Sequence, residues 1–363
     1  MRTFGFIGLG LIGGSLAKGI KRTHPNDHIM AYDYAKETLQ IALREHIIDT
    51  VLNDIDERIS QCDFVILCTP VSYNASYLKI IKPLLKPGAI LTDVGSTKTT
   101  IHEQIIALDM EDRFIGGHPM AGSERSGYEA SNDHLVENAY YIITPTKKST
   151  PSQINAMVSF ASDLSAIPMV LDYKKHDYIV AAISHLPHII ASSLINLVRD
   201  SDTEEHTMKQ VAAGGFKDIT RIASSSPIMW QQICMANSDN IVPILQDYIS
   251  SLNRIVHFIQ AKDSDNLFRL FAESGEYRNS IPDRSSGPIK KEYALYCDII
   301  DEAGAIATIA TTLAIHQISI KNIGIIHNRE FDQGALKIEF YTEQACIDAA
   351  KQLTACNYQI YMR

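Results

Sequence analysis

Short apolar runs alternate with amphipathic stretches of helical period along the first 172 residues. The apolar runs are bounded by turn residues and cover 3–7, 28–33, 64–69, 89–94, 114–117, 140–144 and 168–171. Helical patterns such as 13–21 and 35–45 lie between most of them. Strands that are buried on both faces form near-continuous apolar runs, and their alternation with helices is typical of a parallel sheet. We therefore predict a doubly wound α/β domain over residues 1–172.

The pattern changes at about residue 173, where strand alternation ends and helical periodicity takes over. Helices are predicted at 176–200, 203–213, 217–224, 227–236 and 238–262. Long apolar helices need partners, so we expect this all-α domain, residues 173–288, to form a homodimer. The segment SIPDRSSGPIKK at 280–291 is rich in Pro, Ser, Gly and charge, which favours a linker.

The last 70 residues predict a third unit, residues 292–363. Strand patterns cover 292–300, 319–327, 335–341 and 358–362, and helical patterns cover 305–316 and 342–354. This βαββαβ order is typical of a small α+β domain.

Composition narrows the class of protein. A hydrophobic content of 45 % with 21 % charged residues indicates a globular chain, and a net charge of −9 leaves no basic surface for nucleic acid. No run reaches the ~18 apolar residues of a membrane span, so we expect a cytoplasmic protein without a membrane partner. The six cysteines form no CxxC pair, which favours reduced thiols and predicts no metal site.

A glycine motif follows the first predicted strand directly and opens the first helix. Its glycines suit a tight turn, the close approach of backbone to a pyrophosphate, and close packing of helix on strand. Asp33 ends the next strand, twenty residues after Gly13, and a carboxylate there binds ribose hydroxyls and repels a 2′-phosphate. The pattern predicts a Rossmann-type domain that binds NAD rather than NADP. The expected cofactor contacts are Gly8, Gly10, Leu11, Ile12, Gly13, Asp33, Thr69 and Pro70.

Three further motifs carry the chemistry. They are DVGSTK at 93–98, GHPMAGSE at 117–124 and SHLPH at 184–188. Together with GGFKDITRIASSSPIMW at 214–230, they closely resemble the prephenate/arogenate dehydrogenase family. The resemblance covers nearly the whole chain and implies NAD-dependent oxidative decarboxylation of prephenate in tyrosine biosynthesis.

The resemblance implies two catalytic residues. Oxidation at C4 of prephenate needs a base for the hydroxyl proton, and histidine titrates near neutral pH. By resemblance this base is His118. Ser96 would orient His118 and touch the nicotinamide, with Thr97 as the neighbouring alternative.

The substrate is an anion, so its carboxylates need cations. Arg221 can bind a carboxylate with two parallel hydrogen bonds, and Lys217 lies one turn earlier on the same face. By resemblance, Glu124 gates the site and Trp230 belongs to the same neighbourhood, from this chain or from a partner subunit. His185 and His188 are one turn apart and are expected either to face the pocket or to cap and pack their helix. Arg221 and Lys217 as surface charges, and Trp230 as a core residue, are the alternatives.

The C-terminal unit resembles an ACT domain, a module that binds amino acids. The resemblance rests on IIDEAGAI at 299–306, the helix that follows, and IKNI at 320–323. It implies an effector site at Asp301, Gly304, Ala305 and Asn322, with feedback inhibition by L-tyrosine. A structural or dimerising appendage is the alternative.

Other functions stay open at this point. Arogenate differs from prephenate by an amino group in place of a keto oxygen, and the sequence separates the two poorly. A β-hydroxyacid dehydrogenase would also join a glycine-motif domain to a helical one, although the GHPMAGSE motif argues against it. A non-catalytic amino-acid-responsive binding protein is the remaining alternative, and the intact His118, Ser96 and Arg221 argue against it.

Overall fold

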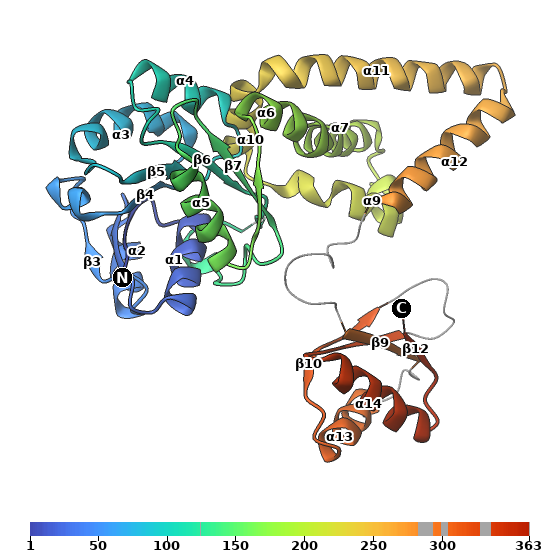
Figure 1. The fold of residues 1–363 in the computed structure, drawn as a ribbon. Coiled ribbons are helices and arrows are strands. Elements are labelled where there is room, and N and C mark those ends of the chain that lie inside the picture. Colours follow the sequence, from blue (N-terminus) through green and yellow to red (C-terminus); the bar gives the residue numbers. More distant parts are fainter. Residues whose placement is uncertain (124, 282–292, 299–303, 327–334, 363) are drawn as a thin grey trace. The chain divides into compact units, whose positions relative to one another are not determined.

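The computed structural model describes residues 1–123, 125–281, 293–298, 304–326 and 335–362. It divides into two compact units, Met1–Pro288 and Ile289–Arg363 (Figure 1). Each unit is described by itself.

The first unit begins with a parallel sheet in the order β3-β2-β1-β4-β5. The strands are β1 (Thr3–Ile7), β2 (His28–Tyr32), β3 (Thr50–Val51), β4 (Phe64–Leu67) and β5 (Ile90–Asp93). The helices between them are α1 (Leu11–Thr23), α2 (Lys36–Arg44), α3 (Asn74–Ile81) and, after β5, α4 (Thr99–Ala107). The strand order reverses between β1 and β4, and dinucleotides bind at such a switch point. The predicted Rossmann-type sheet is confirmed.

Apolar side chains cover both faces of this sheet, which explains the continuous apolar runs in the sequence. In β4, Phe64 and Ile66 pack into one core cluster, while Val65 and Leu67 pack into the other. Successive side chains of a strand point to opposite faces, so each strand supplies both clusters. Phe4 stacks on Phe64 within the first cluster.

The next three strands form a separate sheet, and here the prediction of a wholly parallel arrangement is wrong. Strands β6 (Ile115–Pro119) and β7 (Tyr140–Pro145) pair antiparallel, and β8 (Ile167–Val170) pairs parallel to β7. A parallel connection requires a crossover, usually a helix. The helix α5 (Pro151–Asp163) provides it between β7 and β8, whereas the described residues between β6 and β7 contain only the short 3₁₀ turn η4 (Tyr128–Ala130).

The region after β8 is helical, as the sequence predicts. It contains α6 (Tyr173–Val180), α7 (Leu186–Ser201), α8 (Thr207–Val211), α9 (Gly214–Thr220), the 3₁₀ turn η6 (Arg221–Ser224), α10 (Pro227–Ala236), α11 (Ser238–Gln260) and α12 (Ser264–Ser280). The predicted single helix over 176–200 contains a π-helical turn, η5 (Ala181–His185), between α6 and α7. This turn ends just before Pro187, which has no backbone N–H to donate.

The stretch Tyr173–Ser201 is long and apolar enough to cross a membrane by length and composition alone. Within the first unit, α6 contacts α4, β7 and α11, and α7 contacts η6, α9 and α11. These contacts place the stretch within the helical region. The later helices of this region carry exposed apolar side chains. On α11 these are Val242, Ile249, Leu252, Val256 and Ile259, and on α12 they are Phe268, Phe271 and Tyr277.

The second unit has the predicted βαββαβ order. Its elements are β9 (Tyr293–Asp298), α13 (Ala305–Ile315), β10 (Ile320–Ile326), β11 (Ala335–Phe340), α14 (Glu343–Ala355) and β12 (Ile360–Met362). The strands form an antiparallel sheet in the order β10-β11-β9-β12. Its core is separate from those of the first unit and includes Leu295, Ile309, Leu336 and Leu353.

Candidate active site

The glycine loop lies between β1 and α1, at the switch point of the sheet. Gly8 has a φ of +94°, and a Cβ there would lie 2.8 Å from the Cys68 carbonyl oxygen. A Cβ at Gly13 would lie 2.5 Å from the Gly8 oxygen. A Cβ at Gly10, by contrast, meets no described atom within 4 Å, so the space above the loop is open. The backbone N–H groups at the start of α1, where Leu11 and Ile12 lie, suit a pyrophosphate there.

Asp33 follows β2 and is held by the glycine loop itself. Its Oδ2 accepts a hydrogen bond from the Leu9 N–H at 2.6 Å, and its Oδ1 accepts one from the Ala35 N–H at 2.8 Å. Thr69 and Pro70 follow β4 at the same carboxyl edge. The loop, the acid and this edge therefore fit an NAD molecule across the switch point.

His118 is placed by close packing of β6 between β5 and β7. A Cβ at Gly117 would lie 2.7 Å from the backbone carbonyl oxygen of Asp93 on β5. A Cβ at Gly116 would lie 2.3 Å from Thr144 Oγ1 on β7. Two glycines in a row thus let the strand approach both neighbours. As a whole residue, His118 is 8 % exposed.

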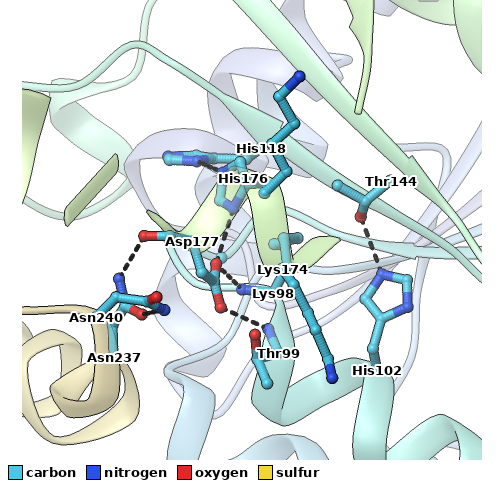
Figure 2. Close-up of polar contacts among 12 residues, drawn as sticks. Lys98, Thr99, His102, His118, Thr144, Lys174, His176, Asp177, Asn237 and Asn240 are labelled. Carbon is cyan, nitrogen blue, oxygen red and sulfur yellow. Dashed lines mark hydrogen bonds and ion pairs between the residues drawn. The ribbon is translucent and has the colours of Figure 1, made fainter. Parts of the chain in front are cut away.

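Two neighbouring residues of α6, His176 and Asp177, form a chain of hydrogen bonds with His118 (Figure 2). His118 Nδ1 lies 2.8 Å from His176 Nε2, and His176 Nδ1 lies 2.8 Å from Asp177 Oδ1. Asp177 also accepts hydrogen bonds from the backbone N–H groups of Lys98 at 2.8 Å and Thr99 at 2.7 Å. His176 and Asp177 are buried. Neither residue belongs to any of the sequence motifs, so the sequence pattern did not indicate either of them.

The environment keeps His118 neutral. Burial lowers the pKa of His118 well below its ordinary value, and His176, Lys98 and His185 lower it further. Burial raises the pKa of Asp177, but hydrogen bonds from His176, Thr99 and Lys98 outweigh it and hold this pKa below its ordinary value. A neutral imidazole has one ring nitrogen that can accept a proton, as a general base requires, and His118 is linked to the ionised Asp177 through His176.

A buried ion pair joins β5 to β6 next to His118. The Lys98 ammonium donates to Asp93 Oδ2 and, at 2.6 Å, to the Gly117 carbonyl oxygen. Asp93 Oδ1 accepts from the Gly117 N–H at 3.3 Å. Burial lowers the pKa of Lys98, and Asp93 opposes that effect. Both residues lie in the DVGSTK motif, but the motif alone did not indicate this ion pair.

Ser96 and Thr97 lie in the turn between β5 and α4. Ser96 is half-buried, and no described hydrogen bond joins it to His118. The Nδ1 atom of His118 is instead engaged by His176. The orienting role of Ser96 stays a prediction. Thr97 is buried, and its Oγ1 has no partner among the described atoms.

His185, His188 and Trp230 gather in one aromatic cluster within this chain. The His188 ring stacks on Trp230 at 3.7 Å between centroids, and the His185 ring meets Trp230 edge-on at 5.9 Å. His185 Nδ1 lies 3.1 Å from Asn237 Nδ2, which also donates to the Asp177 carbonyl oxygen. Burial lowers the pKa of His185 to about 4. The cluster therefore borders the His176–Asp177 pair through Asn237.

The two predicted cationic residues lie on segments that contact α7. Lys217 is on α9 and Arg221 begins η6, and both elements contact α7. Both side chains are exposed. Glu124 lies outside the described residues.

A Rossmann-type domain, an NAD-binding edge and a buried neutral histidine define a dehydrogenase. The family model for the prephenate dehydrogenase nucleotide-binding domain matches residues 16–169, and the model for the prephenate dehydrogenase dimerization domain matches residues 172–273. The chain belongs to the prephenate dehydrogenase family and is an NAD-dependent dehydrogenase.

Individual relatives agree with this assignment. The chain is 37 % identical to prephenate dehydrogenase of Bacillus subtilis over 94 % of each chain. It is similar to the crystal structure of prephenate dehydrogenase from Aquifex aeolicus in complex with hydroxyphenyl propionate and NAD⁺, with a TM-score of 0.73, 32 % identity and coverage of 78 % of this chain and 99 % of that chain. It is also similar to Synechocystis arogenate dehydrogenase, with a TM-score of 0.69, 29 % identity and coverage of 77 % and 100 %.

Proposed function

We propose that the chain oxidises and decarboxylates prephenate to 4-hydroxyphenylpyruvate and CO₂, with His118 as the general base. The observation that carries this proposal is the buried neutral imidazole of His118 on β6, close to the carboxyl edge of the NAD-binding sheet. The B. subtilis and A. aeolicus relatives, which are prephenate dehydrogenases, support it.

The chain's own residues supply the proton chemistry and the orientation of the substrate. His118 Nε2 accepts the proton of the C4 hydroxyl, because its Nδ1 is engaged by His176. When bound, NAD accepts the hydride from C4. Loss of CO₂ then makes the ring aromatic. Ser96 lies in the turn after β5, where it would orient the nicotinamide and His118.

We assign the carboxylates of the substrate to Arg221 and Lys217, since an acidic chain must concentrate positive charge at an anion site. His185, His188 and Trp230 would form an aromatic wall beside them, and Glu124 would gate the site. The contacts of α7 with α9 and η6 support this grouping.

NADH formation tests the substrate directly. The purified chain with NAD is expected to reduce it on addition of prephenate, and a chain that produces no NADH would contradict the proposal. Arogenate is the second candidate, because the Synechocystis relative is an arogenate dehydrogenase. Comparing kcat/KM for the two substrates decides between them.

We infer a homodimer through the helical region 173–288. The exposed apolar side chains on α11 follow one another at helical spacing. The family model that matches residues 172–273 describes a dimerization domain. We expect the mass of a dimer by sedimentation. Val256→Asp should shift the mass toward the monomer, because a charge in an apolar interface is costly. Asp247→Ala on the same helix is the control, and a monomeric parent chain would overturn the inference.

We propose that the second unit is an ACT-like sensor that lowers activity when L-tyrosine binds. Gly304, at the start of α13, has a φ of +98°, and a Cβ there meets no described atom within 4 Å. Ala305 begins that helix, and Asn322 is exposed on β10. These features leave room for a ligand backbone at the helix start. Asp301, the fourth residue of the expected site, lies outside the described residues.

Tyrosine titration of the full chain tests the sensor. A coupling of ~1–3 kcal/mol predicts a roughly 5–150-fold loss of substrate affinity at saturating tyrosine. Asn322→Ala is expected to raise the tyrosine concentration for half-inhibition about tenfold, whereas its neighbour Lys321→Ala should not. Unchanged inhibition in a chain that ends at residue 288 would contradict the proposal.

A further inference from the structure

Asp177 fixes the direction of every hydrogen bond between itself and His118. The N–H groups of Lys98 and Thr99 can only donate, so both oxygens of Asp177 act as acceptors. His176 Nδ1 must then carry a hydrogen and donate it to Asp177 Oδ1. The other ring nitrogen, His176 Nε2, is left as an acceptor.

The same logic sets the tautomer of His118. Because His176 Nε2 accepts, His118 Nδ1 must donate to it across their 2.8 Å separation. The lone pair of neutral His118 is therefore on Nε2, for which the described part of the chain shows no hydrogen bond, and this atom can accept the proton of the substrate hydroxyl. Without this network, neutral imidazole has two tautomers, and only one of them has its lone pair on Nε2.

Charges of both signs lie close to this histidine pair. The carboxylate of Asp177 bonds His176, and the Lys98 ammonium is bonded to the carbonyl of Gly117, the residue before His118. The charged and titratable groups around the pair come from the β5–α4 segment, α6 and η5, and they are Asp93, Lys98, His102, His176, Asp177 and His185. Asp177 is the one whose charge stabilises a proton on the pair through a direct bond to His176.

We propose that His176 and Asp177 are positioning residues that fix the reactive tautomer of His118 and share the proton it abstracts. This rests on the proposed role of His118. As the hydroxyl O–H bond breaks, an N–H bond forms at His118 Nε2. The proton on His118 Nδ1 moves toward His176 Nε2, and the positive charge spreads to a ring that Asp177 already binds. No electrons move along this relay, since bound NAD would accept both electrons of the oxidation as hydride from C4.

The test uses the full chain with Asp177→Asn, His176→Gln and the double variant. Asp177→Asn should lower kcat about 10–10³-fold, because the tautomer of His118 is no longer fixed. Asp177→Asn also removes the negative charge that stabilises a protonated His118 through the hydrogen-bonded network, so the acid limb of kcat/KM should move to lower pH. His176→Gln keeps a hydrogen-bonding group but no second proton site. Because Asp177 acts through His176, the double variant should lose little more than His176→Gln alone.

Asp172→Asn is the matched control. Asp172 caps the same helix and also accepts two backbone N–H bonds, from Lys174 and Lys175, but it is exposed and outside the relay. It should leave the pH profile unchanged. A fall in kcat for Asp177→Asn without movement of the acid limb, or additive losses in the double variant, would overturn the proposal. If the parent chain turns over prephenate and these variants behave like it, only the relay fails. If the parent chain is inactive, the proposed function itself fails.

Discussion

His118→Asn is expected to lower kcat for prephenate about 10²–10⁴-fold while NAD binds as in the parent chain. The reason is that asparagine fits the space on β6 but cannot accept the hydroxyl proton at any working pH. NAD affinity should persist, because the glycine loop and Asp33 lie on other strands. Steady-state kinetics and NAD titration by fluorescence measure the two effects separately.

His134→Asn is the control for this variant. His134 is exposed in the same domain, where it pairs with Asp133 and Glu137. It should turn over prephenate at the parent rate. Near-normal turnover by His118→Asn would remove the assignment of the base, whatever the fate of the relay.

Arg221→Ala is expected to raise KM for prephenate about 10–10²-fold, with a smaller effect on kcat. A charge-assisted pair with a carboxylate contributes roughly 1.5–3 kcal/mol, and losing binding common to the ground state and the transition state raises KM alone. Arg221→Lys should recover part of the loss, because lysine keeps the charge but not the planar fork. KM for NAD should not change.

Arg199→Ala is the comparison for Arg221→Ala. Arg199 lies near the end of α7, is exposed and pairs with Asp200, so removing it tests a general loss of positive charge. An unchanged KM for prephenate in Arg221→Ala, or an equal rise in Arg199→Ala, would show that the carboxylates bind elsewhere.

The parts of the molecule that depend on local pattern could be predicted well. The glycine loop is recognisable because a positive φ at Gly8 and close approaches of 2.8 Å at Gly8 and 2.5 Å at Gly13 exclude side chains at these two positions. Asp33 is recognisable by its position after a strand, and the βαββαβ order of the second unit follows from its alternating periods. In each case the physical constraint lies within a few residues of the chain, or within one strand–helix unit.

The antiparallel pairing of β6 with β7 could not be predicted in the same way. The sequence of an apolar run such as 114–117 is the same whether the strand pairs parallel or antiparallel. Its apolar residues reflect burial between neighbouring elements and not the direction of the strand. The π turn before Pro187 was missed for a similar reason, since the pattern of helical period continues across it.

By itself, the sequence determined the Rossmann-type sheet, the NAD-binding loop, the helical region and the identity of His118 as the histidine within a specific motif. Only the tertiary structure decided what surrounds that histidine. His118 and His176 are 58 residues apart, and Asp177 is 79 residues from the backbone N–H of Lys98 that holds it. Hydrogen bonds between buried groups depend on distances of about 3 Å, and such distances between remote segments are set by packing of the folded chain and not by any local period.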